Sequence, residues 1–82
     1  MKKMFSESAQ RIWSRLQREQ SPHVVYLQKD DNSLRTKPMA SPRANELFKS
    51  PKHYVLGVYD QRCPMEWIDD DLTWLDRLFA TS

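Results

Sequence analysis

The 82-residue sequence contains a single glycine, Gly57, and a single cysteine, Cys63. A phosphate-cradling loop needs several glycines, because its backbone must approach the ligand without a Cβ in the way. The scarcity of glycine therefore excludes a P-loop and a dinucleotide-binding fingerprint. One cysteine likewise excludes the intramolecular disulfides on which many small secreted domains depend.

Long apolar segments are missing as well. No apolar run approaches the roughly 20 residues that a membrane-spanning helix needs. The positively charged N-terminus is not followed by the apolar segment of a signal peptide. We therefore expect a cytoplasmic protein without membrane contact. The length suits one small globular domain over residues 1–82, and three Trp, three Tyr and three Phe supply enough buriable rings to argue against disorder.

The charge is divided unevenly along the chain. Residues 1–53 carry 11 Lys/Arg and 5 Asp/Glu, a net charge of +6, whereas residues 54–82 carry 2 Lys/Arg and 6 Asp/Glu, a net charge of −4. Such polarity suits an interaction protein with one basic and one acidic surface. It also suits a domain whose two ends simply face each other.

Periodicity predicts two main helices and one short one. Over residues 5–20 an apolar stripe recurs at helical spacing, with Ser6 as the expected N-cap and Pro22 beyond the end. The members of this stripe are Phe5, Ala9, Ile12, Trp13 and Leu16. A short helix is expected over residues 42–49, capped by Ser41.

Strand-forming residues dominate two segments. Residues 23–29 are β-branched and aromatic, and residues 53–60 are almost continuously apolar, which predicts a central strand. Gly57 within it marks either a bulge or the point where a helix crosses the strand. Residues 33–38 are expected to return as an edge strand that Pro38 limits. The predicted fold class is α+β, with a small antiparallel sheet of two to three strands packed against two main helices plus a short one.

Three consecutive aspartates, Asp69, Asp70 and Asp71, lie between two tryptophan-containing apolar clusters. In one continuous helix over residues 65–79, Asp71 would lie between two apolar stripes, which would turn an ionised carboxylate towards the core. We therefore expect residues 64–68 to form a separate turn and the last helix to start at the aspartates, with Asp69 or Asp70 as its cap. The spacing is not that of a calcium loop, so no metal is expected.

Catalytic chemistry has little support in the sequence. Cys63 could act as a nucleophile with His23 or His53 as its base, but a strand of seven residues would separate His53 from Cys63 by roughly 20 Å. The histidines and the cysteine also lack zinc-ligand spacing. We expect no enzyme activity, no catalytic residues and no cofactor. A small ribonuclease-like toxin, which needs only Arg, Lys, His and Tyr, is the least favoured alternative.

A nucleic-acid-binding protein is the second alternative, because cationic side chains neutralise phosphates and release counterions. Further lysines and arginines occur at positions 2, 3, 43, 49 and 52, and Tyr26, Tyr54 or Tyr59 could stack bases on an open sheet face. The candidate surface consists of Arg11, Arg15, Arg18, Lys29, Arg35 and Lys37. These side chains could equally form an ordinary solvated face.

The favoured hypothesis is a regulatory protein that binds another protein, as an adaptor or inhibitor. Trp, Tyr and Arg most often anchor interfaces, and the last helix carries two tryptophans beside its acidic run. An exposed patch there would mark a protein partner or a homodimer contact, whereas a wide buried face would bury the same rings. The candidate surface consists of Trp67, Asp69, Asp70, Asp71, Trp74 and Leu78.

Overall fold

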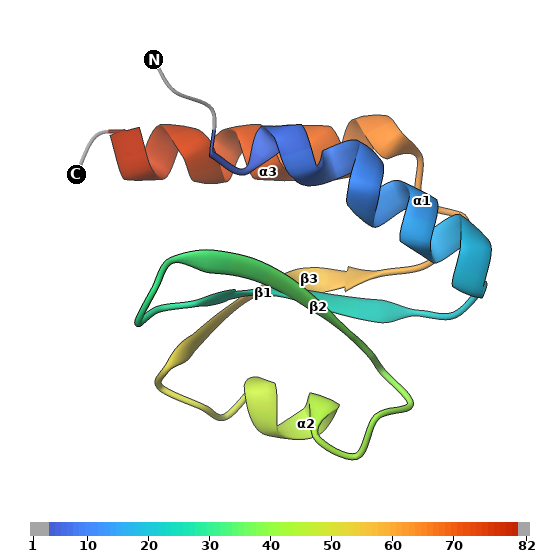
Figure 1. The fold of residues 1–82 in the computed structure, drawn as a ribbon, viewed down its shortest axis with the longest axis horizontal. Coiled ribbons are helices and arrows are strands. Elements are labelled where there is room, and N and C mark those ends of the chain that lie inside the picture. The colour runs from blue at the N-terminus through green and yellow to red at the C-terminus, as the bar shows by residue number, and fades with distance from the viewer. Residues whose placement is uncertain (1–3, 81–82) are drawn as a thin grey trace.

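The computed structural model describes residues 4–80 and confirms the predicted α+β fold class (Figure 1). A three-stranded antiparallel sheet packs against two main helices and one short helix. The elements in chain order are one 3-10 turn (Ser6–Ser8), α1 (Ala9–Glu19), β1 (His23–Gln28), β2 (Ser33–Pro38), α2 (Ala44–Leu47), β3 (His53–Tyr59) and α3 (Met65–Ala80).

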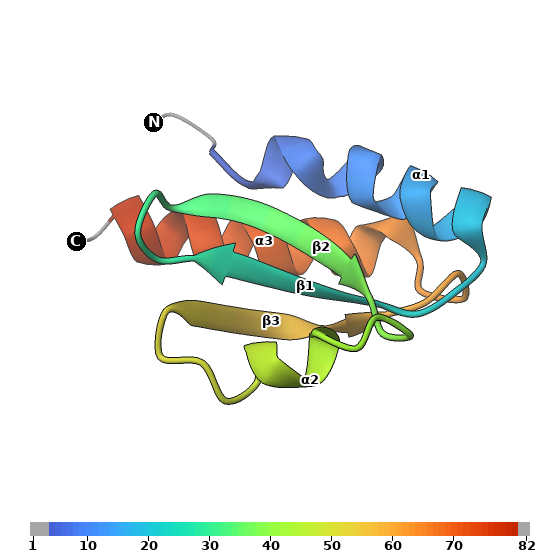
Figure 2. The same ribbon diagram turned by 60° about the horizontal axis from the view of Figure 1, so that its bottom comes forward.

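The central strand is β1, since the order in the sheet is β2-β1-β3. The expectation that residues 53–60 form the central strand is wrong. Five consecutive residues of β1 are buried, so this strand fills both faces of the sheet. In β3, by contrast, Tyr54 and Val58 are exposed, because the strand has a neighbour on one side only. The second and third strands therefore form the two edges of the sheet (Figure 2).

The helices cover the two faces of the sheet unequally. The long helices α1 and α3 lie on one face and the single turn of α2 lies on the other (Figure 1). The larger core comprises Phe5, Ala9, Ile12, Leu16, Val25, Leu27, Tyr59, Ile68, Leu72 and Leu75. The smaller core comprises Val24, Tyr26, Ala44 and Leu47. The apolar stripe predicted for the first helix is thus confirmed, and Trp13 packs partly buried against it.

Of the two alternatives for Gly57, the structure has a bulge, formed with the residue directly before it. Val25 pairs with Gly57, whereas the next residue, Tyr26, pairs with Val55, so Leu56 is the extra residue of β3. An extra residue reverses the alternation of side chains along the strand. As a result, Leu56 packs against the larger core together with Tyr59, three positions along the chain.

The third helix is continuous from Met65 to Ala80, so the separate turn and the cap expected at the aspartates are wrong. The first turn begins after Pro64, whose carbonyl accepts the Trp67 N–H at 3.1 Å. The expected conflict at Asp71 does not arise because its side chain is exposed and accepts a hydrogen bond from the Tyr59 hydroxyl at 2.5 Å. The buried face of α3 is instead the stripe that contains Ile68 and Leu72.

The smaller boundaries also differ from the expectations. Gln20 ends α1 in the left-handed conformation with φ of 52°, one residue before Ser21. The α2 helix starts at Ala44, two residues later than predicted, since Ser41 caps a preceding turn: its carbonyl accepts the Ala44 N–H at 3.0 Å. The edge strand over residues 33–38 is confirmed.

The start of the first helical segment is held by a residue distant in sequence. Asp76 of α3 accepts hydrogen bonds from the backbone N–H groups of Met4, Phe5 and Ser6, each at 2.9 Å. The prediction of Ser6 as the N-cap is wrong, because the cap carboxylate comes from the neighbouring helix and no side-chain cap bond forms locally. Burial alone would raise the pKa of Asp76, but these hydrogen bonds outweigh burial and lower it.

Replacing Asp76 by alanine should therefore destabilise the fold. Three backbone donors would lose their acceptor, one of them buried at Phe5, which should lower the free energy of unfolding by about 2–3 kcal/mol. Urea denaturation followed by circular dichroism measures this change. Asp69→Ala is the matched control on the same helix: its carboxylate is exposed, and the change should be within about 0.5 kcal/mol. Equal stability of the two variants would contradict the capping role.

The Asp76 carboxylate should also make the free energy of unfolding depend on pH in the acidic range. Because the pKa of Asp76 is lower in the folded protein than its ordinary value of 3.8, its stabilisation is present above that value and is lost as the pH falls through the depressed folded pKa. We expect the free energy of unfolding to fall less steeply between about pH 5 and pH 2 in Asp76→Ala than in the unaltered chain. If the free energy of unfolding fell equally steeply with pH in both proteins, the capping role of Asp76 would be contradicted.

Candidate functional site

The outer side of α3 carries large apolar side chains that the fold does not bury. Trp67 is 61% exposed, Trp74 is 54% exposed and Leu78 is 46% exposed. Together with Asp71 they lie at positions 67, 71, 74 and 78, spaced by four, three and four residues. This spacing forms one line along a helix, as in the contact stripe of two packed helices. We call these four residues the α3 seam.

The third strand extends the α3 seam sideways. Tyr54, 40% exposed, lies next to it, and a hollow of about 220 Å³ is lined by Tyr54, Leu56, Asp71 and Trp74. A second hollow of about 220 Å³ is mainly apolar and shares Tyr54 with the first. Its lining comprises Leu27, Lys29, Asn32, Tyr54, Leu75, Leu78 and Phe79. The seam therefore borders two adjoining hollows, one of them mainly apolar.

The hydrogen bond between Tyr59 and Asp71 joins the seam to the core. Burial raises the pKa of Tyr59 far above its ordinary value, and the Asp71 carboxylate raises it further by accepting the hydroxyl hydrogen and by its negative charge. The hydroxyl consequently remains a donor at neutral pH. This bond holds the Asp71 side chain in a fixed position between the two tryptophans of the seam.

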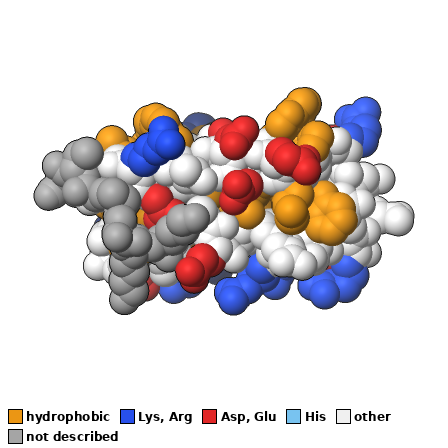
Figure 3. Space-filling model, turned by 90° about the horizontal axis from the view of Figure 1, so that it is seen from above, with side chains coloured by type: hydrophobic (Ala, Val, Ile, Leu, Met, Phe, Trp, Pro, Cys, Tyr) orange, Lys and Arg blue, Asp and Glu red, His pale blue; other side chains and the backbone are white. Residues whose placement is uncertain are grey.

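The remaining acidic residues of the predicted partner surface are less closely grouped. At 100° per residue, Asp70 lies beside the seam, whereas Asp69 points to nearly the opposite side of the helix. Both are exposed. Figure 3 shows acidic side chains gathered over the helical layer with hydrophobic side chains beside them. The structure thus brings together all members of that predicted surface except Asp69.

A basic hollow lies between α1 and β2. Its volume is about 510 Å³, and its charged lining consists of Arg11 and Arg15 from the helix and Arg35 and Lys37 from the strand. We call this hollow the cationic groove. The other two cations of the predicted basic surface do not reach it: Arg18 is exposed elsewhere on α1, and Lys29 lines the apolar hollow beside α3.

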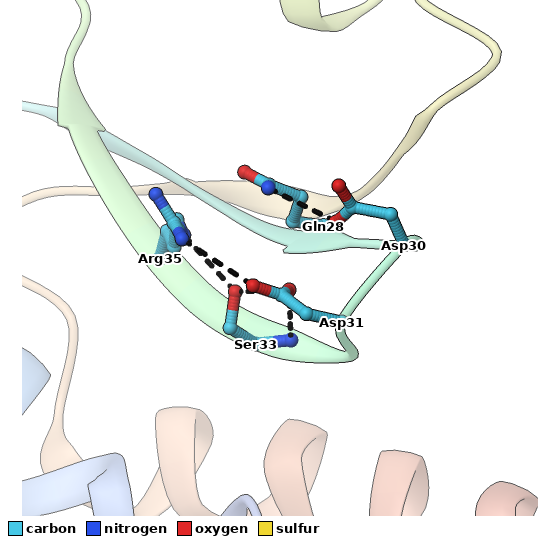
Figure 4. Close-up of polar contacts among 5 residues, drawn as sticks. All are labelled: Gln28, Asp30, Asp31, Ser33 and Arg35. Carbon is cyan, nitrogen blue, oxygen red and sulfur yellow. Dashed lines mark hydrogen bonds and ion pairs between the residues drawn. The ribbon is translucent and has the colours of Figure 1, made fainter.

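Arg35 is held in place by the β-hairpin turn (Figure 4). Its guanidinium lies 3.5 Å from the Asp31 carboxylate, and its Nε donates to the Ser33 hydroxyl at 3.0 Å. Asp31 in turn accepts both the hydroxyl and the backbone N–H of Ser33 at 2.6 and 3.0 Å. These two hydrogen bonds, and then the charge of Arg35, lower the pKa of Asp31. The turn therefore holds the Arg35 side chain in place before any ligand binds to the groove.

A smaller hollow of about 250 Å³ adjoins the cationic groove on the α2 side. Tyr26 and Lys37 line both hollows, and Arg43, Glu46 and His53 add charged and titratable groups to the smaller one. Arg43 therefore lines the same hollow as Lys37, which is also a member of the cationic groove. Sequence reasoning counted this arginine among the scattered cations but had no signal that placed it beside Lys37.

The expectation that tyrosines stack bases on an open sheet face is wrong for two of the three. Tyr26 and Tyr59 are buried, because helices cover both faces of the sheet. The Tyr26 ring instead packs against the His53 ring in a T-shaped arrangement, with centroids 5.3 Å apart. Tyr54 is exposed, but on the acidic side of the molecule beside α3.

The cysteine and the histidines do not form a site. Cys63 is half-buried with Sγ 3.9 Å from the Asp60 carboxylate, and within residues 4–80 no hydrogen bond links it to a histidine. His53 lies at the other end of β3, where its Nδ1 is 2.8 Å from the Ser50 hydroxyl. His23 is fully buried and its Nδ1 lies 2.9 Å from the Ser21 carbonyl.

Residues 4–80 contain neither a metal-binding cluster nor a helix that could cross a membrane. No group of three or more His, Cys, Asp or Glu side chains is arranged to hold a metal ion. In the same part of the chain, none of the helices has the length and apolar character required to cross a membrane.

Comparisons with protein-family models, with curated proteins and with solved structures give no match to this chain.

The bond between Tyr59 and Asp71 gives a titration that can be measured. Of the three tyrosines, we expect Tyr59 to remain protonated well above pH 10, so its tyrosinate absorbance should be missing from the native titration. Because its pKa is raised by folding, this contribution to stability is present below pH 10 and is lost as the pH rises through the folded value. Asp71→Ala should lower the pKa of Tyr59. Ionisation of all three tyrosines together near their ordinary pKa would contradict the bond.

Proposed function

We propose that this chain is a non-enzymatic, cytoplasmic regulatory protein that binds another protein through the α3 seam, as an adaptor or inhibitor. The observation that carries the proposal is the pair of half-exposed tryptophans, Trp67 and Trp74, on one line of a helix. A tryptophan side chain buries about 150–250 Å² when it is covered, so leaving two of them in water is costly. Tryptophan is also among the residues that contribute most to interface affinity.

The shape of the surface favours a helix as the bound segment. The α3 seam spans twelve residues from Trp67 to Leu78, about 16 Å along the helix axis. The alternating spacing of four and three residues matches the stripe of a second helix lying alongside. An added strand is less well suited to the neighbouring edge of the sheet, because the bulge at Leu56 interrupts the regular alternation of β3. The expected partner segment is therefore an amphipathic helix.

The charge of the seam indicates what that helix carries. Asp71 lies within the seam and Asp70 beside it, and residues 54–82 have a net charge of −4. A partner helix with Lys or Arg next to its apolar stripe complements these carboxylates. A second copy of this chain is less favourable, since it would bring two acidic runs together across the interface. The proposal is accordingly a basic amphipathic helix of a different protein.

Replacing Trp74 by alanine should weaken this binding at least 30-fold, which corresponds to about 2 kcal/mol. Stability should change little, because more than half of the ring is exposed. The partner segment is identified first by replacing Trp67 with a photoreactive phenylalanine derivative and sequencing the crosslinked peptide. The affinity of that peptide for each variant is then measured by isothermal titration calorimetry.

Two variants make the test specific. Phe48→Ala, which removes another half-exposed ring on the α2 side of the sheet, should leave the affinity unchanged. Asp70→Lys should weaken binding of a basic helix and should make it less sensitive to salt. A crosslink to a second copy of this chain, or a crosslinked segment that binds Trp74→Ala as tightly as the unaltered chain, would overturn the proposal.

A further inference from the structure

We propose that the cationic groove, together with the adjoining hollow at Arg43, binds the sugar-phosphate backbone of a single-stranded nucleic acid. This surface lies at the β2 edge of the sheet, whereas the α3 seam lies at the β3 edge. The inference therefore goes beyond the proposed protein contact and does not depend on it.

The first argument is the convergence of positive charge. Five cationic side chains line the two hollows. They are Arg11 and Arg15 of α1, Arg35 and Lys37 of β2, and Arg43, which directly precedes α2. Nothing in the local sequence brings them together, since Arg11 and Arg35 are 24 positions apart. Like charges repel one another, so a cluster of this kind is unfavourable until an anion occupies it.

The carboxylates nearby neutralise only part of this charge. Asp31 pairs with Arg35 at 3.5 Å, and Glu19 lies 3.9 Å from Arg15. Glu46 is the only acidic residue in the lining of either hollow. Within the described part of the chain, Arg11, Lys37 and Arg43 belong to no ion pair. Three cations therefore remain available for phosphate oxygens, and two more are already oriented by their pairs.

The path of the cations favours a flexible single strand. The register places Lys37 opposite Val24 and Arg35 opposite Tyr26, on the α2 side of the sheet, whereas Arg11 and Arg15 belong to α1 on the other side. A ligand that touches all of them must turn around the β2 edge. Figure 2 shows β2 as the outer strand on the side of α1.

The small size of the molecule sharpens this point. Its longest dimension is 34 Å, so any turn around the edge must be made within this length. Duplex DNA has a persistence length of about 500 Å and cannot bend on this scale without a large deformation energy. A single strand follows such a path readily, with its phosphates on the cations.

The residues that line the two hollows also indicate that this site does not recognise individual bases. Tyr26, the only tyrosine among the described residues that line the two hollows, is buried and packs against the His53 ring. Stacking platforms of the kind found in sequence-selective single-strand binders are thus missing from the lining of these hollows. Hydroxyl groups of Ser8, Thr36 and Ser50 offer further donors for phosphate oxygens. Binding should therefore depend on the backbone and little on sequence.

The experiment measures fluorescence anisotropy of a labelled oligothymidylate, about 20 nucleotides long, at several salt concentrations. The double variant Arg11→Ala/Arg35→Ala removes two cations of the groove. Its matched control, Arg18→Ala/Lys29→Ala, removes the same charge from exposed positions outside it. We expect the groove variant to lose at least tenfold in affinity and its salt slope to become shallower by about 1.4, which is the change for two phosphate contacts on a single strand.

The control should stay within about twofold of the unaltered chain, and Arg11→Lys/Arg35→Lys should retain most of the affinity. Circular dichroism of each variant verifies that the fold is intact. Oligonucleotides of other sequence should bind equally, and a duplex of the same length more weakly.

The inference would be overturned by no binding at low salt, by equal loss in the groove and control variants, by tighter binding of duplex than of single strand, or by equal binding of polyglutamate. Polyglutamate binding would identify an acidic protein as the ligand. Cleavage of an RNA strand that is lost in His53→Ala would replace a binding site by a ribonuclease site. Since Trp67 and Trp74 lie outside the groove, Trp74→Ala should leave oligonucleotide binding unchanged, and the two proposals can fail independently.

Discussion

The fold depends on one constraint, the burial of β1 on both faces and its pairing on both sides. Val24 and Tyr26 belong to the smaller core while Val25 and Leu27 belong to the larger one, so a single strand connects the two. A chain of 82 residues has few other segments that could serve in this way. Once β1 occupies the middle, both remaining strands become edges, and the two long helices are committed to the same face.

Local patterns predicted the elements more successfully than their assembly. The stripe from Phe5 to Leu16 and the strand-forming segments are visible in the sequence, because each depends on spacing within a few residues. The continuity of α3 was not predicted, since the group that accommodates Asp71 is the Tyr59 hydroxyl at the end of another element. Asp76 was missed for a similar reason: its hydrogen-bond donors lie 70 to 72 positions away in the chain.

The two candidate surfaces differ in the same way. One is grouped by spacing within a helix, and the other by packing between segments that are distant in the sequence. Helical periodicity alone brings Trp67, Trp74 and Leu78 into line, although it could not tell whether that line was buried. The cationic groove needs the pairing of β2 with β1 and the packing of α1 above them, so its members could be named from the sequence but not grouped. The structure separates Lys29 from the other cations and adds Arg43. The charge division seen along the chain becomes a division between the two edges of one sheet.

The two edges also bear on the risk of aggregation. A regular, flat edge strand is a template on which other chains can form fibrils. Here β2 ends in Pro38 and carries Arg35 and Lys37, which repel a second basic edge, and β3 is made irregular by its extra residue, Leu56. Loss of that one residue would restore regular alternation along β3 and would convert it into an apolar template. The bulge therefore makes β3 a poorer template for fibril formation as well as directing Leu56 to the core.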